Sequence, residues 1–191
     1  MRIIAGIHKG RTLAAPKGAK TRPTAARARE GLFNMLAHGG HGPDGGPAMA
    51  GAVVLDAFAG TGAFAFEALS RGALSATLLE IDARAVDAAR DNAAKLAEQD
   101  HTTIRRMDAT RPRTATAAHG LVFLDPPYGM KLGAKALKAL AAKGWIASGA
   151  LVVAEVAAGE KFTPPEGFAL IDERSFGAAR FVLMRYQGNE T

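Results

Sequence analysis

Short apolar runs alternate with amphipathic segments from residue 52 onward. The apolar runs, rich in valine, leucine and isoleucine, predict strands at residues 52–57, 75–81, 103–107, 120–124 and 150–156. Between them, apolar residues recur at helical spacing and predict helices near residues 63–71, 83–97 and 132–143. Strands that alternate with helices are typical of a parallel sheet covered on both faces.

The end of the chain follows a different pattern. Two apolar runs, residues 169–173 and 180–186, are separated only by residues 174–179. This connection is too short for a helical crossover and predicts an antiparallel hairpin. The whole pattern predicts an α/β fold with a Rossmann-like, mostly parallel sheet of seven strands that ends in this hairpin.

A small hairpin and a helix are predicted before the sheet. Ile3-Ile4 and Leu13 flank a turn region at residues 6–10, and Pro23 suits the first turn of a helix. The apolar face of this helix consists of Ala28, Leu32, Met35 and Leu36. We expect an N-terminal extension at residues 1–38, a Gly/Pro-rich link at 39–51 and a main domain at 52–187.

The positive charge of the chain is concentrated in this extension. Residues 1–38 hold eight Lys and Arg residues and one acid, a net charge of +7, whereas the other 153 residues sum to −1. A basic segment on a near-neutral body is typical of a protein that docks on polyphosphate, although a solvated tail is the alternative. The residues expected to contact phosphates are Arg2, Lys9, Arg11, Arg22 and Arg27.

Composition excludes several classes of protein. The chain has 191 residues and no cysteine, so disulfides, thiolate metal sites and cysteine nucleophiles are excluded. Its five histidines lack metal-ligand spacing apart from the loose pair His38 and His41, and we expect no metal. It lacks a membrane-spanning run and a signal-peptide pattern. We therefore expect a cytoplasmic monomer with no membrane partner.

A glycine-rich turn follows the first strand of the main domain and predicts a cofactor site. Asp56 and Phe58 precede Gly60 and Gly62, whose backbone can approach a ligand closely. With Ala65 the pattern also satisfies the Gly-x-Gly-x-x-Ala fingerprint of dehydrogenases. Asp56 would repel a dinucleotide pyrophosphate, whereas it would attract the sulfonium and ammonium of S-adenosylmethionine. Asp56 could instead cap a helix or brace the loop.

Acids also end the next two strands. Glu80 can accept hydrogen bonds from two ribose hydroxyls, while Asp82 has the position of an N-cap for the following helix. Asp108 could accept a hydrogen bond from the adenine amino group or could form a turn. We therefore add Glu80 and Asp108 to the cofactor site.

The sequence Asp125-Pro126-Pro127-Tyr128 ends the fourth strand and predicts the reaction site. Two prolines stop the strand and fix a rigid turn. Asp125 and the carbonyl of Pro126 can accept both hydrogens of a planar amine, and Tyr128 can stack on its base. Hydrogen bonds of this kind stabilise the positive charge that develops when such an amine attacks a methyl group. A strand that simply ends at proline is the alternative.

These residues resemble the RsmD family of bacterial 16S rRNA guanine-N2 methyltransferases, within the class I S-adenosylmethionine-dependent fold. The similar stretches are residues 2–6, 9–11, 21–24, 27–30, 32–34, 56–62, 67–73, 79–82 and 125–128. The resemblance implies that S-adenosylmethionine methylates a guanine of 16S rRNA in the small ribosomal subunit and leaves S-adenosylhomocysteine. The chain departs from the family in two places. The link after Leu36 is long, and Ala65 stands where a glycine is common.

Two other functions remain open at this point. DNA adenine-N6 and protein glutamine-N5 methyltransferases share the Pro-Pro-aromatic turn, although glutamine enzymes usually have Asn where this chain has Asp125, and 191 residues leave little room for a DNA-reading domain. A noncatalytic RNA-binding module is the other alternative. The presence of Asp56, Glu80 and Asp125 together argues against it.

Overall fold

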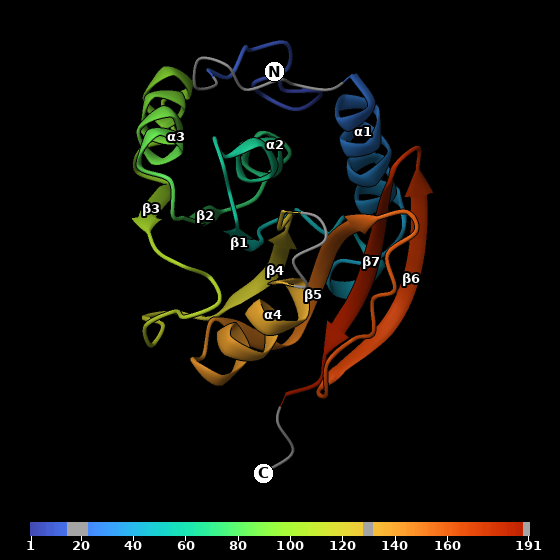
Figure 1. The fold of residues 1–191 in the computed structure, drawn as a ribbon. Helices are drawn as coiled ribbons and strands as arrows, with labels where there is room; N and C mark the ends of the chain where they lie inside the picture. The colour runs from blue at the N-terminus through green and yellow to red at the C-terminus, as the bar shows by residue number, and fades with distance from the viewer. Residues whose placement is uncertain (15–22, 128–131, 189–191) are drawn as a thin grey trace.

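The computed structural model describes residues 1–14, 23–127 and 132–188. Its seven strands form one sheet in the order β3-β2-β1-β4-β5-β7-β6 (Figure 1). All neighbours from β3 to β5 are parallel, and β7 pairs antiparallel with both β5 and β6. The strands are β1 (Val53–Ala57), β2 (Ser75–Glu80), β3 (Thr102–Arg106), β4 (His119–Leu124), β5 (Ile146–Ala157), β6 (Phe168–Phe176) and β7 (Ala179–Tyr186). The predicted fold class is confirmed.

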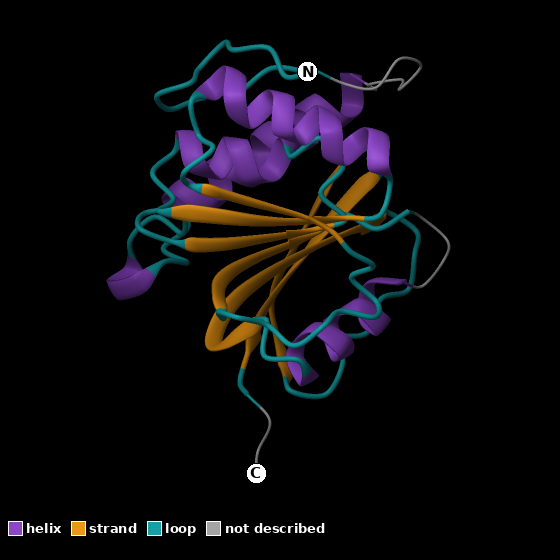
Figure 2. Ribbon diagram, turned by 90° about the vertical axis from the view of Figure 1, so that its left-hand side faces the viewer, coloured by secondary structure: helices purple, strands orange, loops and turns teal. Residues whose placement is uncertain are grey.

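Helices cover both faces of the sheet because each helix has one apolar side. The helices are α1 (Pro23–His38), α2 (Ala63–Ser70), α3 (Ala83–Leu96), α4 (Leu132–Ala142) and the short 3-10 helix η1 (Pro43–Gly45). Figure 2 shows α1, α2 and α3 on one face and α4 on the other. On the first face Phe33 and Phe66 pack with Phe123, and on the second Leu137 packs with Trp145.

Two predicted boundaries are wrong. We expected β5 to begin at Ala150, but it begins at Ile146, which pairs with His119 before the register shifts. We also expected a loop at residues 174–179, but β6 runs to Phe176 and only two residues join it to β7. Gly177, at φ 63°, permits this tight turn.

The N-terminal segment turns back on itself as predicted, but within residues 1–14 it forms a single bridge, Arg2 with Thr12, rather than two strands. Ile3 and Leu13 are buried in the core formed by α1 and α2. The link after α1 contributes to the same core, because Met49 is buried there and Ala48 donates a hydrogen bond to the Leu36 carbonyl.

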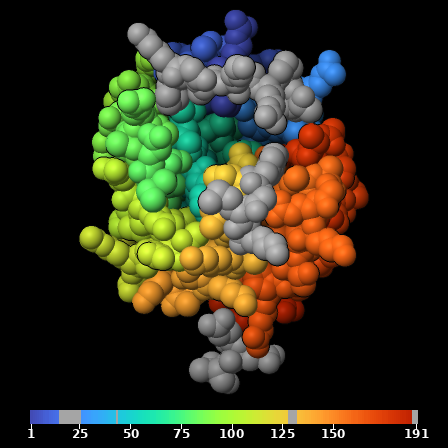
Figure 3. Space-filling view, viewed as in Figure 1, coloured from blue at the N-terminus to red at the C-terminus, as the bar shows by residue number. Residues whose placement is uncertain are grey.

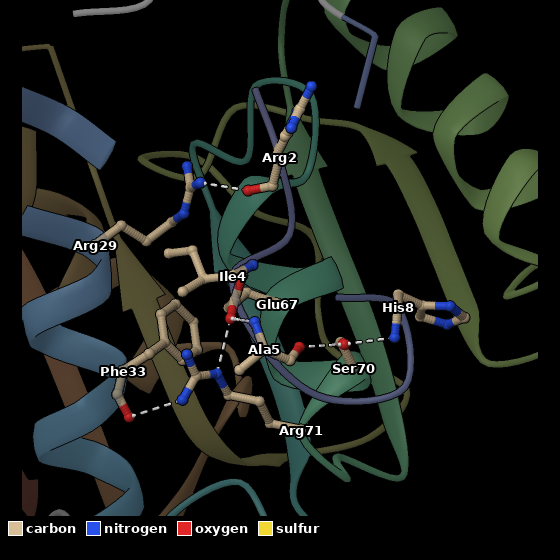
Figure 4. A network of polar contacts seen from close by, with 9 residues as sticks. All are labelled: Arg2, Ile4, Ala5, His8, Arg29, Phe33, Glu67, Ser70 and Arg71. Carbon is tan, nitrogen blue, oxygen red and sulfur yellow. Dashed lines mark hydrogen bonds and ion pairs between the residues drawn. The ribbon is translucent and has the colours of Figure 1, made fainter. Parts of the chain in front are cut away.

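A polar network attaches this segment to α2 (Figure 4). The fully buried Glu67 accepts the N–H groups of Ile4 at 2.8 Å and Ala5 at 3.1 Å. It also accepts a hydrogen bond from Arg71 Nε at 2.7 Å. Ser70 Oγ accepts the His8 N–H at 3.0 Å. Glu67 therefore provides side-chain partners for the start of the chain, and it is paired with a cation itself.

Candidate active site

The glycine-rich turn between β1 and α2 lies at the carboxyl edge of the sheet. Gly60, at φ 54°, has open space where a side chain would project, so nothing described blocks a ligand from its backbone. A methyl group on Gly62 would lie 2.4 Å from Phe66 and 2.8 Å from Leu78, so this glycine serves packing. Phe58 has a positive φ of 67° and is half-buried in the turn.

Asp56 is completely buried beneath this turn. Its Oδ2 accepts the Ala65 N–H at 3.0 Å, while its Oδ1 is buried and has no partner among the described residues. Burial raises the pKa of Asp56 to about 7, the hydrogen bond from Ala65 opposes that rise, and the charge of Glu80 adds to it. Asp56 thus braces the first turn of α2 and also has one oxygen without a partner.

Glu80 holds the glycine-rich turn from the neighbouring strand. Its Oε2 accepts the Gly60 N–H at 2.8 Å, and its Oε1 accepts the N–H groups of Ile81 at 2.7 Å and Asp82 at 2.8 Å. Asp82 accepts hydrogen bonds from Arg84 and Ala85 and is the N-cap of α3, as predicted. The carboxylate of Glu80 is therefore fixed at the mouth of the turn.

Asp108 lies beyond β3 and forms a local turn. Its Oδ1 accepts both the N–H and the hydroxyl of Thr110 at 2.8 Å. Partial burial raises the pKa of Asp108. The two bonds from Thr110 and the charges of Arg111 and Lys135 lower it by more, so the pKa lies below its ordinary value. Asp108 is an ionised acceptor near neutral pH.

Asp125 follows β4 and lies among other acids. Burial raises its pKa to about 8, and the charges of Glu155 and Asp56 add to the rise. Leu124 pairs with Ala154 and Phe123 with Asp56, so Asp125 ends the central strand between these two acids. The structure therefore brings Asp56 and Asp125, far apart in sequence, to one place.

A cavity of about 260 Å³ lies beside the proline turn. Its walls come from the turn, the start of α4, the end of β5 and the loop that follows β5. They include Pro126, Pro127, Leu132, Glu155, Lys161 and Phe162. In the space-filling view, teal atoms near the start of α2 and yellow atoms near the end of β4 lie set back between α3 and the C-terminal strands (Figure 3).

Sequence reasoning missed two residues of this edge. Ile81 follows Glu80 directly at the end of β2, and its side chain is 61% exposed. Glu155 lies near the end of β5, directly after a run of buried residues, and it lines the cavity. An acid within the otherwise apolar run of residues 150–156 was the signal that could have found it.

The basic extension lies on the α2 and α3 side of the sheet. Arg2, Lys9, Arg11 and Arg27 are exposed, and Arg11 also donates to the Lys95 carbonyl of α3 at 3.4 Å. Figure 4 shows the Arg2 side chain pointing away from the Glu67 network, while the Arg2 carbonyl accepts from Arg29 at 2.8 Å. Arg22 and Tyr128 lie outside the described residues.

Comparison with known proteins identifies the family. Residues 1–185 match a family model described as conserved hypothetical protein 95. Ribosomal RNA small subunit methyltransferase D of Haemophilus influenzae is 31% identical over 187 residues, which cover 96% of this chain and 92% of that protein. The protein of the same name from Escherichia coli K12 is 34% identical over 184 residues, covering 96% and 88%. The chain belongs to the RsmD family.

The resemblance drawn from the motifs is thus confirmed. A solved structure from Escherichia coli, the candidate methyltransferase yhhF, superposes with a TM-score of 0.80 at 33% identity and covers 99% of each chain. The fold is therefore shared with this structure over nearly the whole chain. Within the described residues, no helix is long and apolar enough to cross a membrane, and no group of three or more acids or histidines is placed to hold a metal.

Proposed function

We propose that this protein transfers the methyl group of S-adenosylmethionine to the N2 amine of a guanine in 16S rRNA of the small ribosomal subunit. One observation carries the proposal: Asp56, buried in β1, and Asp125, directly after the adjacent strand β4, lie close enough that the charge of Asp56 raises the pKa of Asp125, and both lie beside an open glycine turn. The names of the relatives, which are ribosomal RNA methyltransferases, support it.

The described residues fit a cationic cofactor. Asp56 keeps a buried oxygen without a partner among them, and four acids interact at one edge of the sheet: Asp56, Glu80, Asp125 and Glu155. A sulfonium or ammonium there would relieve the repulsion among the acids, whereas a pyrophosphate would add to it. Glu80 would accept the ribose hydroxyls, Ile81 would offer an apolar surface to the adenine, and Asp108 would accept its amino group. Phe58, Gly60 and Gly62 would shape the turn around the cofactor.

The chain's own residues would prepare the guanine amine for attack. When bound, S-adenosylmethionine supplies an electrophilic methyl group. Asp125 and the Pro126 carbonyl would accept the two N2 hydrogens and hold the nitrogen in line. The carboxylate of Asp125 would stabilise the positive charge that develops on this nitrogen during methylation. The raised pKa of Asp125 suits it to take the released proton.

The basic extension would hold the RNA over this edge. Arg2, Lys9, Arg11, Arg22 and Arg27 would contact phosphates, and Tyr128 would stack on the guanine once it leaves its own stack. A single copy of the chain carries all of these groups, so we propose a monomeric enzyme.

Substitution of Asp125 by alanine tests the proposal. We expect Asp125→Ala to retain S-adenosylhomocysteine binding by calorimetry and to lose methyl transfer by at least about a hundredfold, because the amine loses its charged acceptor. The assay follows N2-methylguanine by mass spectrometry in small subunits from a strain that lacks the gene. Asp87→Ala, an exposed acid on α3, is the control. Wild-type turnover by Asp125→Ala, or a methylated product other than N2-methylguanine, would refute the proposal.

A further inference from the structure

Glu155 lies directly beside Asp125 at the carboxyl edge of the sheet. Leu124, the last residue of β4, is paired with Ala154 of β5. The residues that follow this pair, Asp125 and Glu155, are therefore neighbours. The two acids interact, because the charge of Glu155 raises the pKa of Asp125. Clustered acids with a shifted pKa at the carboxyl edge of a sheet are candidates for contact with a ligand.

A cavity lies next to Glu155, and its lining includes Glu155 and the two residues that follow Asp125, although not Asp125 itself. Its volume of about 260 Å³ is slightly below the roughly 300–1,000 Å³ of pockets that hold drug-sized ligands. Pro126, Pro127 and Phe162 provide apolar walls, and Glu155 is an acid on the same lining. A methyl group on Gly133 would lie 3.3 Å from Phe162 and 3.8 Å from Pro126, so these two walls approach closely at the start of α4.

The pairing edge of guanine is complementary to two neighbouring carboxylates. Guanine presents two adjacent donors, the N1–H and the N2 amine, and an ionised carboxylate only accepts hydrogen bonds. Adenine presents an amine next to N1, which is an acceptor, so a second carboxylate there would face a lone pair. Enzymes that take a base out of its stack read it through this edge.

We propose that Glu155 accepts the N1–H of the guanine whose N2 amine lies at Asp125, and thereby selects guanine over bases whose N1 is an acceptor. This inference rests on the proposed function and adds the residue that sets base specificity. Glu155 touches the base but not the reacting nitrogen, so it acts in recognition.

An analogue that keeps the N2 amine and lacks the N1–H tests this assignment. The substrates are small subunits assembled with rRNA that carries either guanine or 2-aminopurine at the target position. We expect wild-type enzyme to favour guanine strongly in kcat/KM. In Glu155→Gln the amide can donate to the N1 of 2-aminopurine, while its oxygen can still accept the guanine N1–H, so the preference should fall at least about tenfold, mostly through faster 2-aminopurine methylation.

Glu166→Gln, an exposed acid in the same loop region, is the matched control and should retain the wild-type preference. S-adenosylhomocysteine affinity and the denaturation midpoint of both variants should equal those of the wild type. An unchanged preference in an active Glu155→Gln enzyme overturns the inference alone. If wild-type enzyme forms no N2-methylguanine in the natural subunit, the proposed function fails and the inference fails with it.

Discussion

Asp56 makes the stability of the free protein depend on pH in an unusual direction. Its pKa rises from 3.8 to about 7 on folding, so the folded state binds its proton more tightly than the unfolded state. Stability from this proton is fully present below pH 3.8 and is lost as the pH rises through about 7. Asp56→Asn removes this loss while its amide oxygen can still accept the Ala65 N–H.

We therefore expect the stability of Asp56→Asn relative to wild type to increase with pH. Between about pH 4 and pH 8 the gain in free energy of unfolding should be on the order of 4 kcal/mol. Urea denaturation at several pH values measures it, and Asp87→Asn, an exposed acid, should show no such trend. A constant difference between Asp56→Asn and wild type would mean that the carboxyl is not buried as described.

The sequence located most acids of this edge because each ends a predicted strand. Asp56, Glu80 and Asp125 were found in this way, since parallel strands bring their carboxyl ends to one edge. The interaction of Asp125 with Glu155 could not be predicted, because it depends on the register between β4 and β5. The bonds of Glu80 to the Gly60 turn likewise depend on tertiary placement.

At the scale of elements, the β1–α2 turn uses its two glycines for different purposes. Gly60 has open space around it, whereas a methyl group on Gly62 would overlap Phe66 and Leu78. We expect Gly60→Ala to cost about 1 kcal/mol of stability and to weaken S-adenosylhomocysteine binding at least about tenfold, because the methyl group fills the space for the ligand.

Gly62→Ala should instead cost about 2–5 kcal/mol of stability, because strain in the left-handed region adds to overpacking. Denaturation and calorimetry on the two variants separate these effects, and each variant is the control for the other. Equal stability losses, or normal ligand binding by Gly60→Ala, would contradict the division of roles.

Element positions were predicted well where periodicity was strong. Helices α2, α3 and α4 match the expected ranges within one residue at each end. The errors at β5 and in the β6–β7 hairpin arose because Ser148, Gly149 and Gly177 have the composition of loops, while strand pairing extends to or across them. Local propensity is weaker than the hydrogen bonds of a neighbouring strand.

At the scale of the whole molecule, the buried side chain of Asn92 connects the N-terminal segment to the glycine-rich turn. Asn92 of α3 is fully buried, accepts the Ala14 N–H at 2.7 Å and donates to the Ala14 carbonyl at 3.1 Å. It also donates to the Thr61 carbonyl in the glycine-rich turn at 3.0 Å. The N-terminal segment is therefore held in a defined position relative to the turn, and not only by Glu67.

This fixed position makes the extension a surface whose charge can be tested separately from the cofactor site. Arg2 and Arg27 are exposed on it, and each phosphate that they neutralise releases condensed counterions. We expect Arg2→Glu and Arg27→Glu each to weaken RNA binding and to reduce the slope of log affinity against log salt by about 1, with unchanged S-adenosylhomocysteine affinity.

Arg113→Glu is the matched control for these two charge reversals. Arg113 is exposed, and its carbonyl accepts from Trp145, the residue before β5, so it lies at the amino edge of the sheet. The charge change is identical, but the RNA should not reach this edge, so the salt slope should stay at the wild-type value. Filter binding of small-subunit rRNA across a salt series measures all three variants. If Arg113→Glu changes the slope as much as Arg27→Glu, net charge rather than a defined surface governs RNA binding.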